Sequence, residues 1–170
     1  MALRDWAPRA NAYVTFLREP RARLRSAYAY RRHHCDGCNA STTLAQFATS
    51  PLNRGVYANM LAGTWDALHG ARETTYPDAA RVAVAVDRLR NFAVVGLLER
   101  WAASVCLLRA KTSGGHVLRN ELANVRPGTD PAPAAADDDY AADWADEAVY
   151  AAARGIFEAD LAAYFGAGVD

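Results

Sequence analysis

The chain lacks several features that would assign it to a common class of protein. Its 170 residues contain no run of about 18 apolar residues, the length that a membrane-spanning helix needs, and no apolar signal-peptide core follows Met1. We therefore expect this chain, taken alone, to be soluble and to make no membrane contact of its own. It has three cysteines, too few for a disulfide scaffold.

The cysteines and histidines also argue against a metal centre. Cys35 and Cys38 form a Cys-x-x-Cys pair in a loop that includes His33 and His34. Structural zinc sites usually draw four ligands from two separated segments, and no second Cys/His cluster exists in this sequence. We expect no metal site, and the pair is left as a local disulfide or as plain thiols. Cys106, in an apolar helix, is expected to be a small core residue.

The composition fits one compact domain spanning residues 1–170. Hydrophobic residues make up 52% of the chain, and the formal net charge is zero. The charge is nevertheless uneven, because the first 35 residues are rich in arginine and the segment after Gly128 is acidic. The basic end suits a nucleotide phosphate or another polyanion, although we expect no nucleic-acid partner. The acidic end is expected to be a solvated helix face.

The most informative stretch is residues 13–28, which predicts a strand, a sharp corner and a helix. Residues 13–17 are aromatic, β-branched or aliphatic, as in a covered strand. Pro20 suits the first turn of a helix, and Glu19 complements its positive end. A helix that starts this way is expected to offer free backbone N–H groups to an anion. Arg18 at the corner and Ser26 two turns later then suit a phosphate monoester.

The remaining pattern predicts an α/β fold. The pattern predicts a helix from Pro77 to about residue 91, a buried apolar strand at residues 92–96 and a helix at residues 97–111. This alternation of helices and a buried strand is typical of βαβ units with crossover helices. A short helix capped by Ser41 or Thr42 is expected to run through Thr49, and another to end at Gly63.

The last third of the chain predicts a long loop at residues 112–139 and a final helix at about 141–165. The loop segment is rich in glycine and proline, and a loop of this length is usually functional or flexible. The helix is expected to be amphipathic and to bury one stripe of side chains, namely Trp144, Val149, Ile156, Leu161 and Tyr164.

Residues 17–28 carry a resemblance to a known family. Leu17-Arg18-Glu19-Pro20-x-x-Arg23-x-x-Ser26-x-Tyr28 resembles the 3′-phosphate-binding motif of the Golgi carbohydrate sulfotransferases, Leu-Arg-Asp-Pro-x-x-Arg-x-x-Ser-x-Tyr. These enzymes use 3′-phosphoadenosine 5′-phosphosulfate (PAPS) as donor. The resemblance implies that Arg18 and Ser26 bind the donor's 3′-phosphate, and we add Arg23 of the motif to the candidates.

Further segments extend the resemblance over most of the chain. Residues 86–101, ending in Val95-Gly96-Leu97-Leu98-Glu99-Arg100-Trp101, resemble the family's Val-Gly-Leu-Thr-Glu-Arg-Phe segment. Looser matches lie at residues 59–63 and 142–157. The variants most similar are the 2-O-type glycan sulfotransferases. The implied fold is an incomplete P-loop-like parallel sheet of about two short strands with a mostly helical remainder.

The resemblance also implies what this chain is missing. In the family, a Pro-Lys-x-Gly-type loop and a catalytic His or Glu precede the 3′-phosphate motif, whereas Lys111 is the only lysine here. The glycine-rich residues 113–116 follow a helix and do not join a strand to one. We therefore expect weak or no turnover by this chain, and its catalytic residues are unknown. Arg54, beside Gly55, and Arg126, in the long loop, are further candidates for donor binding.

Two other functions remain open at this level. The first is a non-catalytic nucleotide or polyanion binder that uses the arginine-rich helix, and the second is a redox or zinc domain built on Cys35 and Cys38. The family's proteins are anchored in the Golgi membrane and face the lumen, with a glycan acceptor as partner, so the resemblance implies the same placement for the full-length protein. The acceptor, the sulfated position and the oligomeric state are not determined by the sequence.

Overall fold

The computed structural model describes residues 13–31, 42–63, 75–112, 116–123 and 140–166, and every structural statement below concerns these residues. This part of the chain is mostly helical around one short sheet, so the expected mixed α/β class is confirmed. The elements in chain order are β1 (Val14–Leu17), α1 (Pro20–Arg31), α2 (Leu44–Thr49), η1 (Pro51–Asn53), α3 (Val56–Ala62), α4 (Ala79–Arg90), β2 (Val94–Leu97), η2 (Leu98–Arg100), α5 (Trp101–Thr112) and α6 (Trp144–Phe165).

The sheet consists of two parallel strands. β1 pairs with β2 in a register that sets Val14 opposite Val94 and Leu17 opposite Leu97. Every residue of β2 is buried, as expected for a strand covered on both faces. The prediction that Leu97 belongs to the following helix is wrong, since it ends β2 and α5 begins only at Trp101. Because the strands are parallel, the segments after β1 and after β2 leave the sheet at the same edge.

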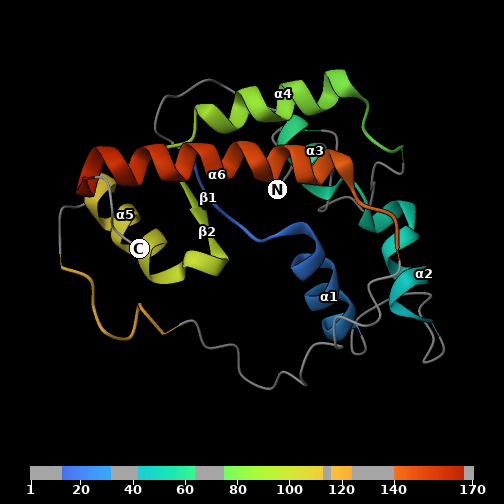
Figure 1. Ribbon diagram of the computed structural model, residues 1–170, viewed down its shortest axis with the longest axis horizontal. Helices are drawn as coiled ribbons and strands as arrows, with labels where there is room; N and C mark the ends of the chain where they lie inside the picture. The colour runs from blue at the N-terminus through green and yellow to red at the C-terminus, as the bar shows by residue number, and fades with distance from the viewer. Residues whose placement is uncertain (1–12, 32–41, 64–74, 113–115, 124–139, 167–170) are drawn as a thin grey trace.

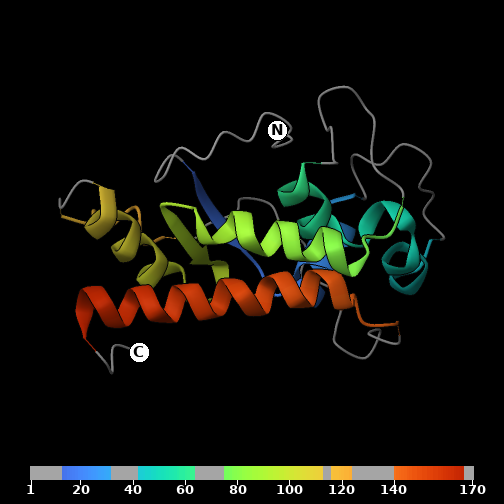
Figure 2. The same cartoon turned by 90° about the horizontal axis from the view of Figure 1, so that it is seen from above.

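Helix α6 runs along most of the molecule and contacts most elements of the core (Figure 1). Seen from above, α4 runs beside it, and α4, α3, α5 and β2 all contact it (Figure 2). Its buried stripe recurs every four residues and consists of Ala145, Val149, Ala153, Phe157 and Leu161. The predicted stripe is wrong at both ends, because Trp144 and Tyr164 are 45% and 49% exposed. Each lies one or more residues off the four-residue repeat and so turns away from the core.

Polar side chains set the helix starts. Asp78 caps α4 by accepting the N–H of Arg81, so Pro77 lies before the helix and does not open it as predicted. Asp143 caps α6 in the same way, so this helix starts at Trp144 and not at residue 141. Helix ends agree better with the sequence, since Gly63 and Gly166 terminate α3 and α6 with positive φ.

The cap of α2 is Thr43, not Ser41 or Thr42 as predicted. The Thr43 hydroxyl accepts the N–H of Gln46, and the Gln46 side chain accepts the N–H of Thr43, which forms a capping box. The three-residue spacing of threonine and glutamine was the signal in the sequence.

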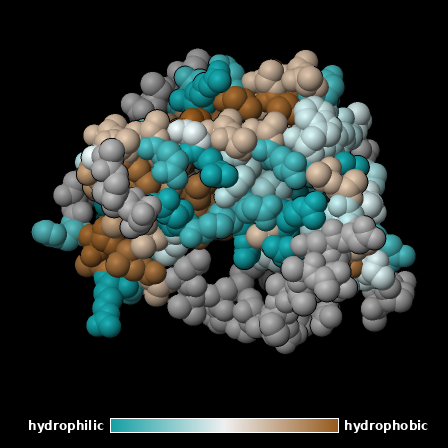
Figure 3. All heavy atoms as spheres, viewed as in Figure 1, coloured by the Kyte–Doolittle hydropathy of each residue, from teal (hydrophilic) through white to brown (hydrophobic). Residues whose placement is uncertain are grey.

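The hydrophobic interior has two parts. The larger cluster joins β2 to α3, α4, α5 and α6. The smaller one packs Leu24 of α1 against Phe47 of α2, with Ala27 and Tyr28 beside them, and this confirms the inward face expected for α1. On the face seen in Figure 3, an apolar patch lies where α5 and residues 116–123 meet, and Leu118 and Leu122 are exposed there.

Within the described ranges, no helix combines the length and apolar character needed to cross a lipid bilayer.

Candidate functional site

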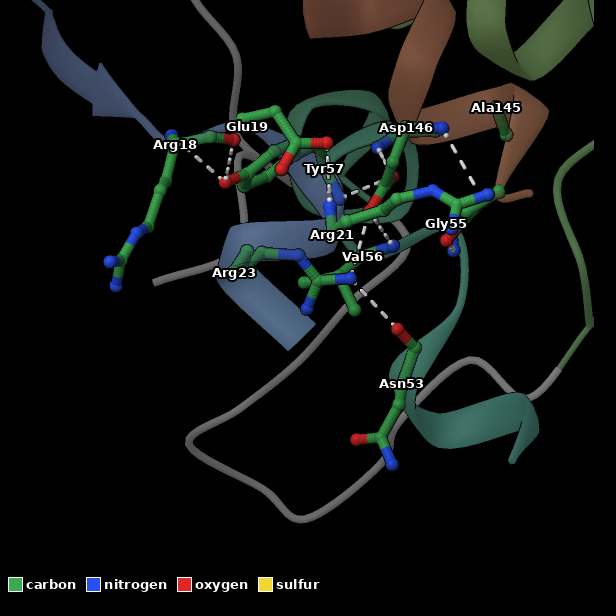
Figure 4. Close-up of polar contacts among 12 residues, drawn as sticks. Arg18, Glu19, Arg21, Arg23, Asn53, Gly55, Val56, Tyr57, Ala145 and Asp146 are labelled. Carbon is green, nitrogen blue, oxygen red and sulfur yellow. Dashed lines mark hydrogen bonds and ion pairs between the residues drawn. The ribbon is translucent and has the colours of Figure 1, made fainter. Parts of the chain in front are cut away.

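The predicted corner between β1 and α1 is held by a tyrosine from α3. The backbone N–H of Arg18 donates to the Tyr57 hydroxyl oxygen at 3.1 Å, and the Tyr57 hydroxyl donates to the Arg18 carbonyl oxygen at 2.9 Å (Figure 4). Burial raises the pKa of Tyr57 to about 12, so the hydroxyl keeps its proton at neutral pH and can make both bonds. The backbone of Arg18 is therefore fixed independently of its side chain.

Glu19 occupies the N-terminus of α1. Its carboxylate accepts the backbone N–H of Arg21 at 2.9 Å and that of Ala22 at 2.6 Å. The expectation that these N–H groups are free for an anion is therefore wrong, because the chain supplies its own carboxylate to them. A phosphate at this corner would have to be bound mainly by side chains.

Glu99, which follows β2 at the same edge of the sheet, connects the corner between β1 and α1 to α6 through hydrogen bonds. Its carboxylate accepts the backbone N–H of Glu19 at 2.7 Å and the Tyr150 hydroxyl at 3.1 Å. The pKa of Tyr150 is raised to about 12, mainly by burial and then by the Glu99 charge, so this hydroxyl also stays a donor. Glu99 thus joins the segment after β1 and the segment after β2 to α6.

Gly96 explains why β1 and α5 can both approach β2 closely. A Cβ atom at Gly96 would lie 2.8 Å from the Phe16 ring and 3.0 Å from the Ser104 Cβ atom. Ser104, which is fully buried, donates to the Leu97 carbonyl oxygen and accepts the Leu97 N–H, both at 2.8 Å. Residues 17–28 and 86–101, the two segments with the clearest resemblance, are therefore connected by close packing and by parallel strand pairing.

The side chains of Arg18 and Ser26 lie on or beside α1. Figure 4 shows the Arg18 guanidinium extending away from Asp146, and among the described residues it has no polar partner. Ser26 is half-buried, and its position seven residues after Glu19 places it on the same side of α1 as Glu19 and Arg23.

Arg23 points into the protein. Its guanidinium donates to the Asp146 carboxylate at 3.2 Å and to the Asn53 carbonyl oxygen at 2.8 Å, and it lies over the Tyr57 ring (Figure 4). The side chain is 16% exposed, and its buried Nε atom has no hydrogen-bond partner in the part of the chain that the structure describes. These contacts give Arg23 a structural partner in Asp146.

Two buried aspartates, which the sequence did not single out, join α6 to α3. Asp146 is fully buried and accepts the backbone N–H groups of Val56, Tyr57 and Ala58 at 2.8–3.3 Å. Asp143 accepts the N–H of Gly55 at 2.8 Å. The prediction that the acidic end of the chain is a solvated face is wrong for these two residues, because each caps a helix start that lacks its own polar cap.

Burial dominates the electrostatics of Asp146. It raises the pKa of this carboxyl to about 7, while the Arg23 guanidinium and the donated N–H groups oppose that rise. The only sequence signal for this role was an Asp-x-x-Asp spacing at the start of the final helix. That spacing predicts a cap for α6 itself and gives no sign of a partner about 90 residues away.

Arg54 lies against the start of α6. Its guanidinium sits 4.5 Å above the Tyr76 ring and donates to the Ala142 carbonyl oxygen at 3.3 Å. Gly55 has a φ of 61°, and a Cβ atom there would lie 2.3 Å from Pro77. The close neighbour of this glycine is thus Pro77, not a ligand as the sequence suggested.

Arg126, Cys35, Cys38, His33 and His34 lie outside the described residues. Within the described part of the chain, no group of three His, Cys, Asp or Glu side chains is placed to hold a metal ion. Cys106 is half-buried on α5, so it is less enclosed than expected.

Comparison with family models, with curated proteins and with solved structures finds no match to this chain.

Proposed function

We propose that this chain contributes the donor 3′-phosphate site of a PAPS-dependent carbohydrate O-sulfotransferase with a P-loop-like parallel sheet. One observation carries the proposal: the two separated segments that resemble the family form a single unit. β1 pairs in parallel with β2, Gly96 leaves room for Phe16, and Glu99 accepts the N–H of Glu19. In α/β folds, ligands bind at the carboxyl ends of parallel strands, where Arg18 lies.

Arg18 is the principal ligand of the phosphate in this proposal. Its backbone is fixed by Tyr57, while its guanidinium makes no polar contact among the described residues. A guanidinium forms paired, charge-assisted hydrogen bonds with phosphate oxygens, and the Ser26 hydroxyl adds a further donor. Because Glu19 occupies the first N–H groups of α1, the positive charge for the phosphate comes from this side chain.

The reaction follows from the donor. A sugar hydroxyl oxygen attacks the sulfur atom in line, the bond from sulfur to the 5′-phosphate oxygen breaks, and adenosine 3′,5′-bisphosphate leaves. The hydroxyl proton passes to a general base, to which we assign no residue of this chain. This chemistry requires no metal ion. A glycan acceptor and a Golgi lumenal location with a membrane anchor in the full-length protein belong to the same proposal.

Calorimetry with adenosine 3′,5′-bisphosphate tests the donor site. Arg18→Ala and Ser26→Ala should each weaken binding, by about tenfold or more for the arginine, because charge-assisted bonds are lost. Adenosine 5′-monophosphate, which lacks the 3′-phosphate, should bind weakly to every variant. Arg90→Ala, which removes an exposed arginine of α4, is the matched control. Equal affinity of wild type and Arg18→Ala would refute the proposal.

The alternative function is a diffuse arginine patch that binds polyanions without a specific site. Two contacts weaken it, since Arg23 pairs with the buried Asp146 and Arg21 lies over the Tyr140 ring. A diffuse patch predicts that Arg21→Ala, Arg25→Ala and Arg18→Ala each lose a similar small part of the affinity. A specific site predicts that Arg18→Ala loses much more affinity than Arg21→Ala or Arg25→Ala.

A further inference from the structure

A separate aromatic surface lies at the start of α6 and consists of Trp144, Tyr76 and Arg54, which we call the Trp144 surface. Trp144 is 45% exposed, although the next residue, Ala145, is completely buried. The Tyr76 ring lies edge-on to the indole with 5.9 Å between ring centroids, and the Arg54 guanidinium lies 4.5 Å from the Tyr76 ring. The Tyr76 ring thus contacts both the half-exposed Trp144 indole and the Arg54 guanidinium.

The Trp144 surface is held rigidly by contacts beneath it. The Tyr76 hydroxyl donates to the Asp143 carboxylate at 2.8 Å and accepts the Ala145 N–H at 3.2 Å. Burial is the main cause that raises the pKa of Tyr76 to about 12, so this ring stays neutral. Arg54 is fixed by the Ala142 carbonyl oxygen. The positive charge of the surface therefore comes from Arg54 in a defined position.

Much of the hydrogen-bonding capacity of the Trp144 surface is unused by the described residues. Arg54 donates one hydrogen bond, to Ala142, out of the five that a guanidinium can donate. The Trp144 indole N–H has no acceptor among the described residues, unlike that of Trp101, which donates to the Glu121 carbonyl oxygen. The surface thus presents an apolar ring face, a neutral donor and a cation, with the Tyr76 ring in contact with both the indole and the guanidinium.

We propose that the Trp144 surface binds an acidic saccharide unit. The apolar C–H face of the sugar ring stacks on the indole, and its carboxylate or sulfate group pairs with Arg54. The inference rests on the proposed function, because it makes this surface a subsite for the acceptor glycan. It uses neither Arg18 nor Ser26, and it assigns Arg54 to the acceptor and not to the donor. Glu147, exposed one turn after Trp144 on the same side of α6, repels such a ligand, so its neutralisation should strengthen binding.

Titration of the full chain with a hyaluronan hexasaccharide, followed by calorimetry and by the indole ¹H–¹⁵N signal of Trp144, tests this inference. Trp144→Ala and Arg54→Ala should each weaken binding about fivefold or more, and Glu147→Gln should strengthen it. The matched controls are Tyr164→Ala, an exposed aromatic at the other end of α6, and Arg90→Ala. Both should bind as wild type. The neutral maltohexaose should bind at least tenfold more weakly, by about the energy of one charged contact.

Three results would overturn the inference: undetectable hexasaccharide binding by the wild type, equal binding of maltohexaose, or an unchanged affinity in both Trp144→Ala and Arg54→Ala. Adenosine 3′,5′-bisphosphate binding by the same variants separates this test from misfolding and from the donor site. It should persist in Trp144→Ala if that variant folds. Retained saccharide binding with no nucleotide binding would refute the donor-site proposal alone.

Discussion

Two polar clusters that share Tyr57 of α3 differ in how their hydrogen-bonding groups are used. In the aspartate junction, formed by Asp143, Asp146 and the N–H groups of residues 55–58, the buried carboxylates are occupied by the protein itself. In the corner, formed by Arg18, Glu19, Tyr57 and Glu99, the backbone is fixed but the Arg18 guanidinium has no polar partner among the described residues.

The difference indicates which charges stabilise the fold and which are available to a ligand. Tyr57 belongs to both clusters, since its N–H donates to Asp146 and its hydroxyl contacts Arg18. Damage to the junction should therefore lower stability first, and it should weaken nucleotide binding only as far as Tyr57 moves.

The largest effect is expected at Asp146. Asp146→Ala leaves three backbone N–H groups and the Arg23 guanidinium without their acceptor. We expect a loss of about 3–5 kcal/mol in the free energy of unfolding, as when one partner of a buried pair is removed. Urea denaturation measures it, with Glu158→Gln as the exposed control. A loss below about 1 kcal/mol would show that the junction is not the stabilising region.

Stability should also depend on pH through Asp146. Because burial raises its pKa from 3.8 to about 7, the folded state holds a proton that the unfolded state releases between these values. The proton bound by Asp146 therefore adds stability that is fully present below pH 4 and is lost as the pH rises through 7, whereas the hydrogen bonds that the side chain accepts remain. Urea midpoints of wild type should fall relative to Asp146→Asn over this window. Parallel curves for the two proteins would contradict the assignment.

Gly96 should tolerate no side chain without a shift of its neighbours. Gly96→Val places atoms against Phe16 and Ser104, and we expect a loss of about 1–3 kcal/mol from overpacking. Gly155→Ala is the matched control, because nothing lies within 4 Å of a Cβ atom there. Thermal denaturation compares the two. Equal stability of both variants would contradict the close packing of β1, β2 and α5.

Tyr57→Phe tests the corner with a smaller change. It removes one hydroxyl and with it both hydrogen bonds to the Arg18 backbone. We expect a loss of about 1–2 kcal/mol in stability and weaker binding of adenosine 3′,5′-bisphosphate, because Arg18 is no longer fixed. Tyr150→Phe, which removes a hydroxyl bonded to Glu99 and not to Arg18, should affect binding less. A larger loss of binding in Tyr150→Phe than in Tyr57→Phe would show that the Tyr57 hydroxyl does not position Arg18.

The smallest effect is expected for an exposed ion pair. Arg100 and Glu158 lie 3.4 Å apart, and the Glu158 side chain is 55% exposed, so Glu158→Gln should change stability by less than about 0.5 kcal/mol. Urea denaturation at low and high salt measures this change in the free energy of unfolding. A salt-sensitive loss above about 1 kcal/mol would mean that surface charges contribute as much as single buried bonds.

The sequence predicted the features that depend on neighbouring residues. The strand at residues 14–17, the helix that begins at Pro20, the buried strand after α4 and the end of α3 at Gly63 all follow from local composition and turn chemistry. The parallel pairing of the strands agrees with the α/β class expected from the order of elements. Boundaries were less accurate because single capping residues, such as Asp78 and Asp143, decide them.

The sequence did not predict features that depend on partners far along the chain. In the sequence Asp146 is one of several acidic residues near the C-terminus. Its role as the cap of α3 depends on the packing of α6 against the start of α3, which the sequence does not show. Trp144 reads as a core residue, yet one step of about 100° around α6 separates it from buried Ala145. The start of α1 was expected to offer free N–H groups to an anion, but the Glu19 carboxylate accepts two of them.

The most direct test of the central claim is whether Arg18 and the donor's 3′-phosphate recognise each other. Affinities of wild type and Arg18→Ala for adenosine 3′,5′-bisphosphate and for adenosine 5′-monophosphate form a thermodynamic cycle that isolates this interaction. We predict a coupling free energy of about 1.5–3 kcal/mol, as for hydrogen bonds to charged groups. A coupling near zero, with Arg18→Ala weakening both nucleotides equally, would contradict the assignment of this corner to the 3′-phosphate.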